Sequence, residues 1–79
     1  MTNLELYNQA FMDVFSVEEK DLANDFSCES VSNWDSMHKL NLMNILEDTF
    51  DFIFEPGDML NFNSYGDGKS ILAKYNIHI

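Results

Sequence analysis

The stretch from Ser36 to Phe50 constrains this chain most, because its apolar residues recur at the spacing of an α-helix. Polar and acidic side chains occupy the opposite side of the helical wheel. Asp35 stands directly before the stretch, and aspartate is a preferred residue at a helix start. We therefore predict an amphipathic helix that begins at Asp35 or Ser36 and runs to about Phe50. Its core-facing side is expected to carry Leu40, Leu42, Met43, Leu46 and Phe50.

Two further helices are indicated on either side of this one. Thr2 followed by Glu5 has the spacing of a capping box. Ser64 followed by Asp67 resembles the cap of a last helix. Gly68 costs that helix on the order of 1 kcal/mol, so we expect a close contact between helices there. The apolar positions are Leu4, Tyr7, Ala10, Phe11, Val14 and Phe15 in the first helix, and Tyr65, Ile71, Leu72 and Tyr75 in the last.

A long polar connection joins the first helix to the central one and includes Glu18, Glu19, Asp21, Asn24, Asp25 and Ser27. A structureless connection of this length is unusual in a small domain unless it is packed down. We expect it to be held on the core by Val17, Leu22, Phe26, Val31 and Trp34.

After the central helix, Pro56-Gly57 follows Phe52-Ile53-Phe54 directly. We interpret the aromatic segment as the exit of the helix; it either closes the core, which we favour, or lines a pocket. Asp58 to Phe62 allows one short helical turn. These elements predict an all-α fold, a small four-helix bundle with three main helices, one short helix and a long loop between helices 1 and 2.

Length and composition limit the class of protein. The 79 residues predict a single domain over 1–79, which buries only about 60% of its unfolded surface. The sequence shows neither a membrane span nor the features of a signal peptide, so we expect a cytoplasmic monomer. The lone Cys28 forms no internal disulfide or zinc site, and we expect its side chain to be buried or half-buried.

Fourteen acidic against four basic residues give a formal charge of −10. Such a surface repels nucleic acid and anionic membranes, and it steers the chain toward basic patches on other proteins. A simpler interpretation is that the charge only keeps a small domain soluble. Because self-repulsion costs stability, we favour a partner selected by charge.

Ser36 is the candidate functional residue. At a helix start its hydroxyl lies near free backbone N–H groups and the positive end of the helix dipole, so a phosphate ester there is electrostatically favoured. Asp35 can cap the same amides and help to hold a divalent metal that carries an incoming phosphate donor. A nucleophilic enzyme is disfavoured, because Ser36 and His38 are two residues apart and do not face each other on a helix.

Together these features resemble the acyl carrier protein family, whose members are small acidic four-helix domains. The resemblance rests on Asp35-Ser36-Met37 and on the order of residues that follows, and it extends over nearly the whole chain. The matching positions after the serine are Leu40, Leu42, Met43, Leu46, Glu47, Asp48, Phe50 and Asp51.

The resemblance implies that a phosphopantetheinyl transferase attaches 4′-phosphopantetheine from coenzyme A to Ser36, with Asp35 as a flanking cap and transfer helper. The thiol of that arm then carries acyl or aminoacyl groups as thioesters, and the chain itself is not an enzyme. Enzymes with basic docking patches load and consume these groups. Their expected docking stripe on the second helix is Met37, Asn41, Asn44, Glu47, Asp48 and Asp51.

Several residues depart from the pattern of carriers in fatty acid biosynthesis. His38 and Lys39 stand where an acidic and a small polar residue are common, and Asn41 replaces a glutamate. Trp34 before Asp35 resembles free-standing carriers of specialised pathways. The pathway, either fatty acid synthesis or a specialised one, therefore stays open, as do the cargo and the effect of His38 and Lys39 on partner choice.

Two other classes of protein fit part of the sequence. An acidic helical interaction module without a cofactor would leave Ser36 as a simple cap. A calcium-binding loop is suggested by Asn63-x-Tyr65-x-Asp67-Gly68. However, Tyr65 stands where such a loop requires Asp or Asn, and Lys74 stands where it requires Glu. We therefore predict no metal site.

Overall fold

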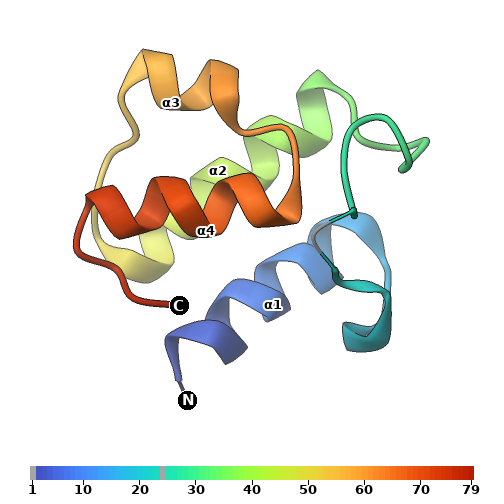
Figure 1. Ribbon diagram of the computed structural model, residues 1–79, viewed down its shortest axis with the longest axis horizontal. Helices are drawn as coiled ribbons and strands as arrows, with labels where there is room; N and C mark the ends of the chain where they lie inside the picture. Colours follow the sequence, from blue (N-terminus) through green and yellow to red (C-terminus); the bar gives the residue numbers. More distant parts are fainter. Residues whose placement is uncertain (1, 24) are drawn as a thin grey trace.

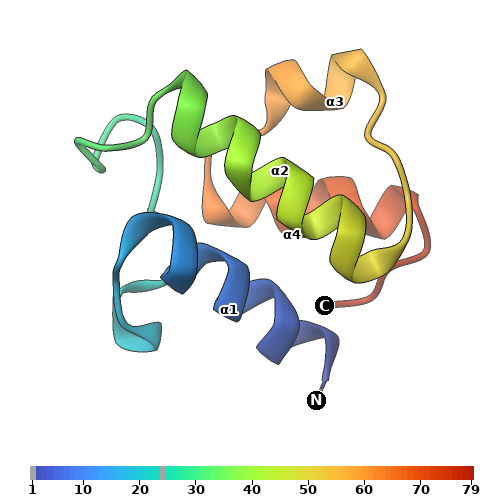
Figure 2. The same cartoon turned by 180° about the vertical axis from the view of Figure 1, so that it is seen from behind.

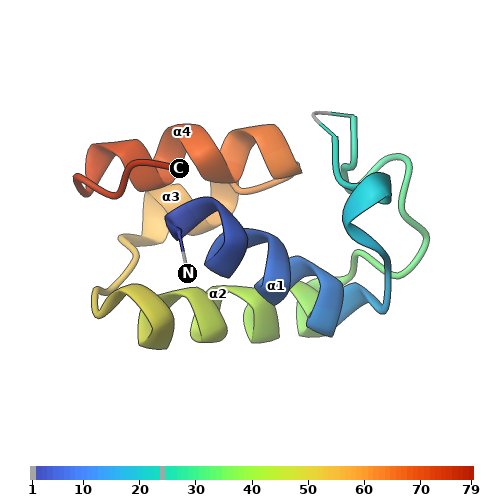
Figure 3. The same cartoon turned by 90° about the horizontal axis from the view of Figure 1, so that it is seen from below.

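The computed structural model describes residues 2–23 and 25–79, so Asn24 of the predicted connection lies outside the described part. In these residues four α-helices form and no strand is present: α1 (Asn3–Phe15), α2 (Ser36–Phe50), α3 (Pro56–Asn61) and α4 (Tyr65–Lys74). Helices α2 and α4 run in the same general direction and α1 runs against them (Figures 1 and 3). The predicted all-α fold with three main helices and one short helix is confirmed.

Helix α1 begins where its capping box predicts. The Glu5 N–H donates to Thr2 Oγ1 at 3.1 Å, and the Thr2 N–H donates to Glu5 Oε1 at 3.3 Å. The helix ends at Phe15, and the next residue, Ser16, caps it with a φ of 56°, in the left-handed region. Of the expected face, Val14 is half-buried and Leu4 is 39% exposed. The fully buried positions are Tyr7, Ala10, Phe11 and Phe15.

The long connection lies on the core, as predicted. Phe26 and Trp34 are buried, while Val17, Leu22 and Val31 pack partly buried against the core. Phe26 meets Phe11 and Phe15 of α1 edge to face, with ring centroids 5.9 and 5.5 Å apart. A short 3-10 turn, Glu19–Asp21, interrupts the connection. The connection is therefore packed on the bundle through its apolar residues and leads directly into the start of α2 (Figure 2).

Helix α4 meets the hydroxyl end of the Tyr7 side chain of α1 at Gly68. A Cβ on Gly68 would lie 2.5 Å from Phe62 Cζ and closer still to Tyr7 Oη. The Tyr7 hydroxyl donates to the Tyr65 carbonyl at 2.6 Å, which joins the two helices. The expected close contact at this glycine is therefore made by side chains, because Tyr7 and Phe62 fill the space that a Cβ would take, and the two helix backbones do not approach closely there. The N-terminal cap is also as predicted, because the Asp67 N–H donates to Ser64 Oγ at 2.9 Å.

Helix α3 is held to the end of α4 through one buried carboxylate. Asp58 accepts from Lys74 Nζ at 2.5 Å and from the Tyr75 hydroxyl at 2.5 Å. The Glu55 N–H donates back to Tyr75 Oη at 2.9 Å. The helix begins at Pro56, two residues before the predicted turn, because proline suits the first helical position.

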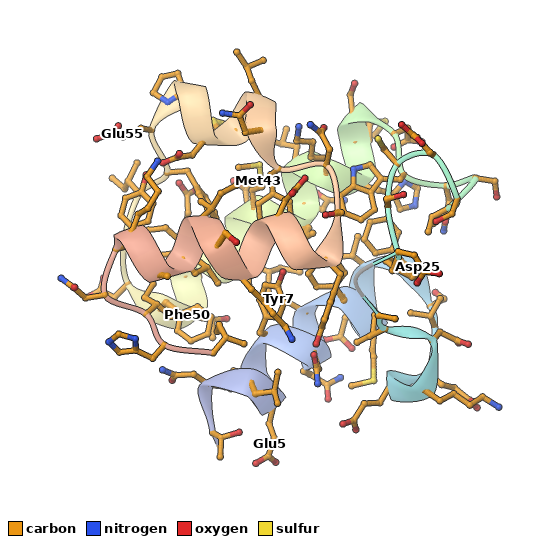
Figure 4. The ribbon with its side chains drawn as sticks, in the orientation of Figure 1. Glu5, Tyr7, Asp25, Met43, Phe50 and Glu55 are labelled. Carbon is orange, nitrogen blue, oxygen red and sulfur yellow. The ribbon has the colours of Figure 1, made fainter. Side chains whose placement is uncertain are left out.

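The aromatic segment before α3 closes the core, as we favoured. Phe54 is buried and Phe52 is half-buried against Tyr75, with ring centroids 4.9 Å apart. Ile53 points outward and is 80% exposed. In Figure 4, Tyr7 and Met43 lie between the helices, whereas Glu5, Asp25 and Glu55 lie at the outside.

Two predictions of burial are wrong. Cys28 is exposed, because its backbone N–H is fixed to the Asn63 carbonyl at 2.9 Å while its side chain faces outward. Leu40 was expected in the core but is 51% exposed. It lies on the side of α2 that faces α3, which is too short to cover it.

Candidate functional site

Ser36 is the first residue of α2 and its side chain is exposed. Asp35 caps the helix, since its Oδ1 accepts from the His38 N–H at 2.9 Å. The His38 ring Nδ1 lies 2.8 Å from the same oxygen. These hydrogen bonds, first the one from the backbone and then the one from the ring, hold the pKa of Asp35 below its ordinary value. The predicted cap is confirmed, and the carboxylate beside Ser36 stays ionised.

His38 anchors this helix start to the end of α1. Its ring stacks on Phe15 with centroids 5.8 Å apart and an interplanar angle of 16°. The sequence analysis did not assign this role. The available signal was the three-residue spacing from Asp35, which brings two side chains together on the first turn of a helix. His38 thus fixes the orientation of Asp35 next to Ser36.

A hollow of about 240 Å³ opens beside Ser36, between α2 and α3. By the same measure a cavity needs only about 10–15 Å³ to hold one water molecule, so the hollow has room for a short acyl chain. Sequence reasoning missed Leu40 and Met59 as residues of this site, because it assigned Leu40 to the core and had no partner for Met59. The hollow is lined by Ser36, Lys39, Leu40, Met43 and Met59.

The predicted docking stripe forms a continuous row along α2, with one exception. Met37 is 75% exposed at its start, and Asp51 ends the helix with a φ of 55°. Glu47 is half-buried, and its Oε2 accepts from the Phe54 N–H at 2.8 Å. Glu47 therefore fixes the backbone that follows the helix, and its carboxylate is less available to contact a partner protein than the exposed members of the row. The other exposed members of the row are Asn41, Asn44 and Asp48.

The calcium-like segment is part of α4. Tyr65 is buried and residues 65–74 form a helix, whereas a calcium loop turns its backbone and acidic side chains around the ion. Within residues 2–23 and 25–79 no group of three or more His, Cys, Asp or Glu side chains is arranged to hold a metal ion.

Comparisons with known proteins bear on the fold. No protein-family model matches the sequence, and no curated protein matches it. A solved structure from Mycobacterium tuberculosis, provisionally named an acyl carrier protein, superposes with a TM-score of 0.80 at 20% sequence identity. The superposition covers 94% of this chain and 99% of the other. This chain has the acyl carrier protein fold. None of the helices in the described part is long and apolar enough to span a membrane.

Proposed function

We propose that this chain is a non-catalytic carrier that holds acyl or aminoacyl groups as thioesters on a 4′-phosphopantetheine arm attached to Ser36. The observation that carries the proposal is an exposed serine hydroxyl at the start of α2, beside an apolar hollow, in an acyl carrier fold. The arm would supply the reactive thiol, and the protein would supply the attachment point.

The local electrostatics suit the attachment of a phosphodiester. Ser36 Oγ would bond to the phosphorus that coenzyme A carries next to pantetheine, the hydroxyl would lose its proton, and the nucleotide part would leave. The positive end of the α2 dipole favours an anion at this position. Asp35 is ionised and next to Ser36, so it suits contact with the magnesium ion that a transferase brings with coenzyme A.

The enzymes that load and unload the arm would dock along α2. Met37 supplies an exposed apolar contact there, and Asp48 and Asp51 supply negative charge. A formal charge of −10 on 79 residues favours partners with basic patches and speeds their encounter. Asn41 makes the part of the row nearest Ser36 less negative than in carriers of fatty acid biosynthesis, which favours partners from a specialised pathway.

The experiment is intact-protein mass after incubation with coenzyme A, magnesium and a broad-specificity phosphopantetheinyl transferase. We expect one phosphopantetheinyl increment on the wild type and none on Ser36→Ala. Ser70→Ala is the matched control, because Ser70 is an exposed serine on α4 and should not affect loading. Circular dichroism of all three proteins establishes that they are folded.

A folded wild type that gains no increment with several transferases would contradict the carrier proposal. The second candidate, an acidic interaction module without a cofactor, would then be favoured. It is supported by the apolar side chains of Ile53 and Leu60, which are 80% and 77% exposed and have no role in the carrier proposal.

A further inference from the structure

Lys39 is the one lysine of the four without a partner in the described part of the chain. None of the carboxylates described lies within 4.0 Å of its ammonium, although the chain carries fourteen acidic residues. The other lysines are each accounted for: Lys20 pairs with Glu18, Lys74 pairs with Asp58, and Lys69 lies over the Tyr65 ring.

The surroundings of Lys39 explain why an anion would be bound there. Its side chain is half-buried, and this burial lowers the pKa of Lys39. The ammonium has therefore lost hydration without gaining a counter-charge. One titratable neighbour acts on it, the exposed Cys28 thiol, which raises the pKa of Lys39 only in its thiolate form.

Lys39 also shares a site with Ser36. The two residues are three apart on α2, a spacing that places side chains on the same side of a helix. Both line the hollow, whose remaining walls are the apolar side chains of Leu40, Met43 and Met59. The hollow thus has a lysine side chain in its lining beside the attachment point, together with apolar walls.

A free anion would be repelled by a chain with a formal charge of −10. An anion tethered to Ser36 would escape this limit, because a short flexible tether gives an effective concentration in the millimolar range. The arm that we assign to Ser36 is such a tether, and on this point the inference rests on the proposed function.

We propose that Lys39 binds an oxyanion that is carried on the arm at Ser36. Leu40, Met43 and Met59 would pack against the apolar atoms of the arm or its cargo next to that oxyanion. Two groups on the arm have this chemistry. One is the phosphodiester of the arm itself. The other is the free carboxylate of a dicarboxylic acyl cargo.

The first experiment compares thermal unfolding midpoints of forms loaded by the transferase. The first two forms are the unmodified chain and the chain with the bare arm. In the other two forms the arm carries a five-carbon acyl group in amide linkage, and this acyl group ends either in a methyl group or in a carboxylate. Each form is prepared as wild type, Lys39→Met and Lys20→Met. Lys20→Met is the matched control, because it removes the same charge from an exposed site far from the hollow in the sequence.

Binding to the phosphodiester predicts that adding the bare arm raises the midpoint more in the wild type than in Lys39→Met, by about 2–6 °C. Binding to the cargo predicts that the carboxylate form has a higher midpoint than the methyl form, and that this difference is larger in the wild type than in Lys39→Met by the same amount. Either gain should persist in Lys20→Met and shrink in high salt. If Lys39→Met changes neither difference, the proposal is wrong.

A second experiment is independent of the transferase. Ser36→Cys in a Cys28→Ser background is alkylated with haloacetamide linkers of equal length that end in carboxylate or carboxamide. A higher thermal midpoint with the carboxylate linker than with the carboxamide linker, which disappears in Lys39→Met, would support the oxyanion site even if enzymatic loading fails. The carrier proposal and the oxyanion proposal can therefore fail separately. Where enzymatic loading fails and the first experiment cannot be run, equal midpoints for both linkers would overturn the oxyanion proposal.

Discussion

Replacing Gly68 by alanine tests the packing that holds α4 against α1. The new Cβ would lie 2.5 Å from Phe62 Cζ and closer still to Tyr7 Oη. Tyr7 and Phe62 are both fully buried, so neither ring can move into solvent. The Tyr7 hydroxyl is also fixed by its hydrogen bond to the Tyr65 carbonyl, 2.6 Å away. We therefore expect a large loss of stability from one methyl group.

The size of the loss follows from three contributions. Overpacking a well-packed core costs about 1–3 kcal/mol. Displacing the buried Tyr7 hydroxyl from its acceptor costs about 1–3 kcal/mol more. Alanine is a better helix former than glycine by about 1 kcal/mol, which offsets part of this. The free energy of unfolding should fall by about 1–5 kcal/mol. The central value of about 3 kcal/mol lowers the midpoint by on the order of 12–24 °C for a domain of this size.

The assay is reversible thermal and urea unfolding followed by circular dichroism. Gly57→Ala is the matched control, because Gly57 is inside α3 and a Cβ there would meet nothing within 4 Å. That variant should be stabilised by about 0.5–1 kcal/mol. Gly68→Ala should also cost less in a Tyr7→Phe background than in the wild type, since the hydroxyl is one of the atoms that it strikes.

Two results would refute this reasoning. One is Gly68→Ala that is as stable as the wild type or more stable, which would mean that helix propensity outweighs the contact. The other is equal destabilisation by Gly68→Ala with and without the Tyr7 hydroxyl, which would place the contact elsewhere.

Three further predictions concern the site and its support. Lys74 and then Tyr75 hold the pKa of Asp58 below its ordinary value of 3.8, so the carboxylate stabilises the fold above that pH and stops doing so as the pH falls through the lowered pKa. The difference in thermal midpoint between wild type and Asp58→Asn should therefore be constant at neutral pH and shrink below about pH 4. A difference that grows in acid would contradict this. Asp35→Ala should lower the midpoint and slow phosphopantetheine loading, measured by mass, whereas unchanged stability would exclude the cap. Leu60→Ser should change the free energy of unfolding by less than about 0.5 kcal/mol, because Leu60 is 77% exposed, and urea unfolding checks it.

Much of the fold could be predicted because its signals are local. The caps at Thr2, Asp35 and Ser64 depend on side chains that reach backbone groups three residues away, and each forms as expected. The bounds of α2 follow from its periodicity and its cap. The buried anchors Phe26 and Trp34 followed from large apolar residues in an otherwise polar connection.

The surroundings of Ser36 depended more on residues far apart in the sequence. Periodicity placed Leu40 on the apolar side of α2, but whether that side is covered depends on the length and position of α3. The same holds for Met59, which lies across the hollow from α2. The role of His38 required Phe15, which is 23 residues away (38 − 15) and is brought beside it by the fold.

The sequence by itself determined the helices, their caps and the serine at the start of α2, because these depend on interactions within a few residues. Only the tertiary structure decided which apolar residues are covered and which line a hollow. It also decided that Lys39 stands in that hollow without a carboxylate partner among the described residues. Such features depend on how helices pack, and the contacts between helices join residues that no local pattern relates.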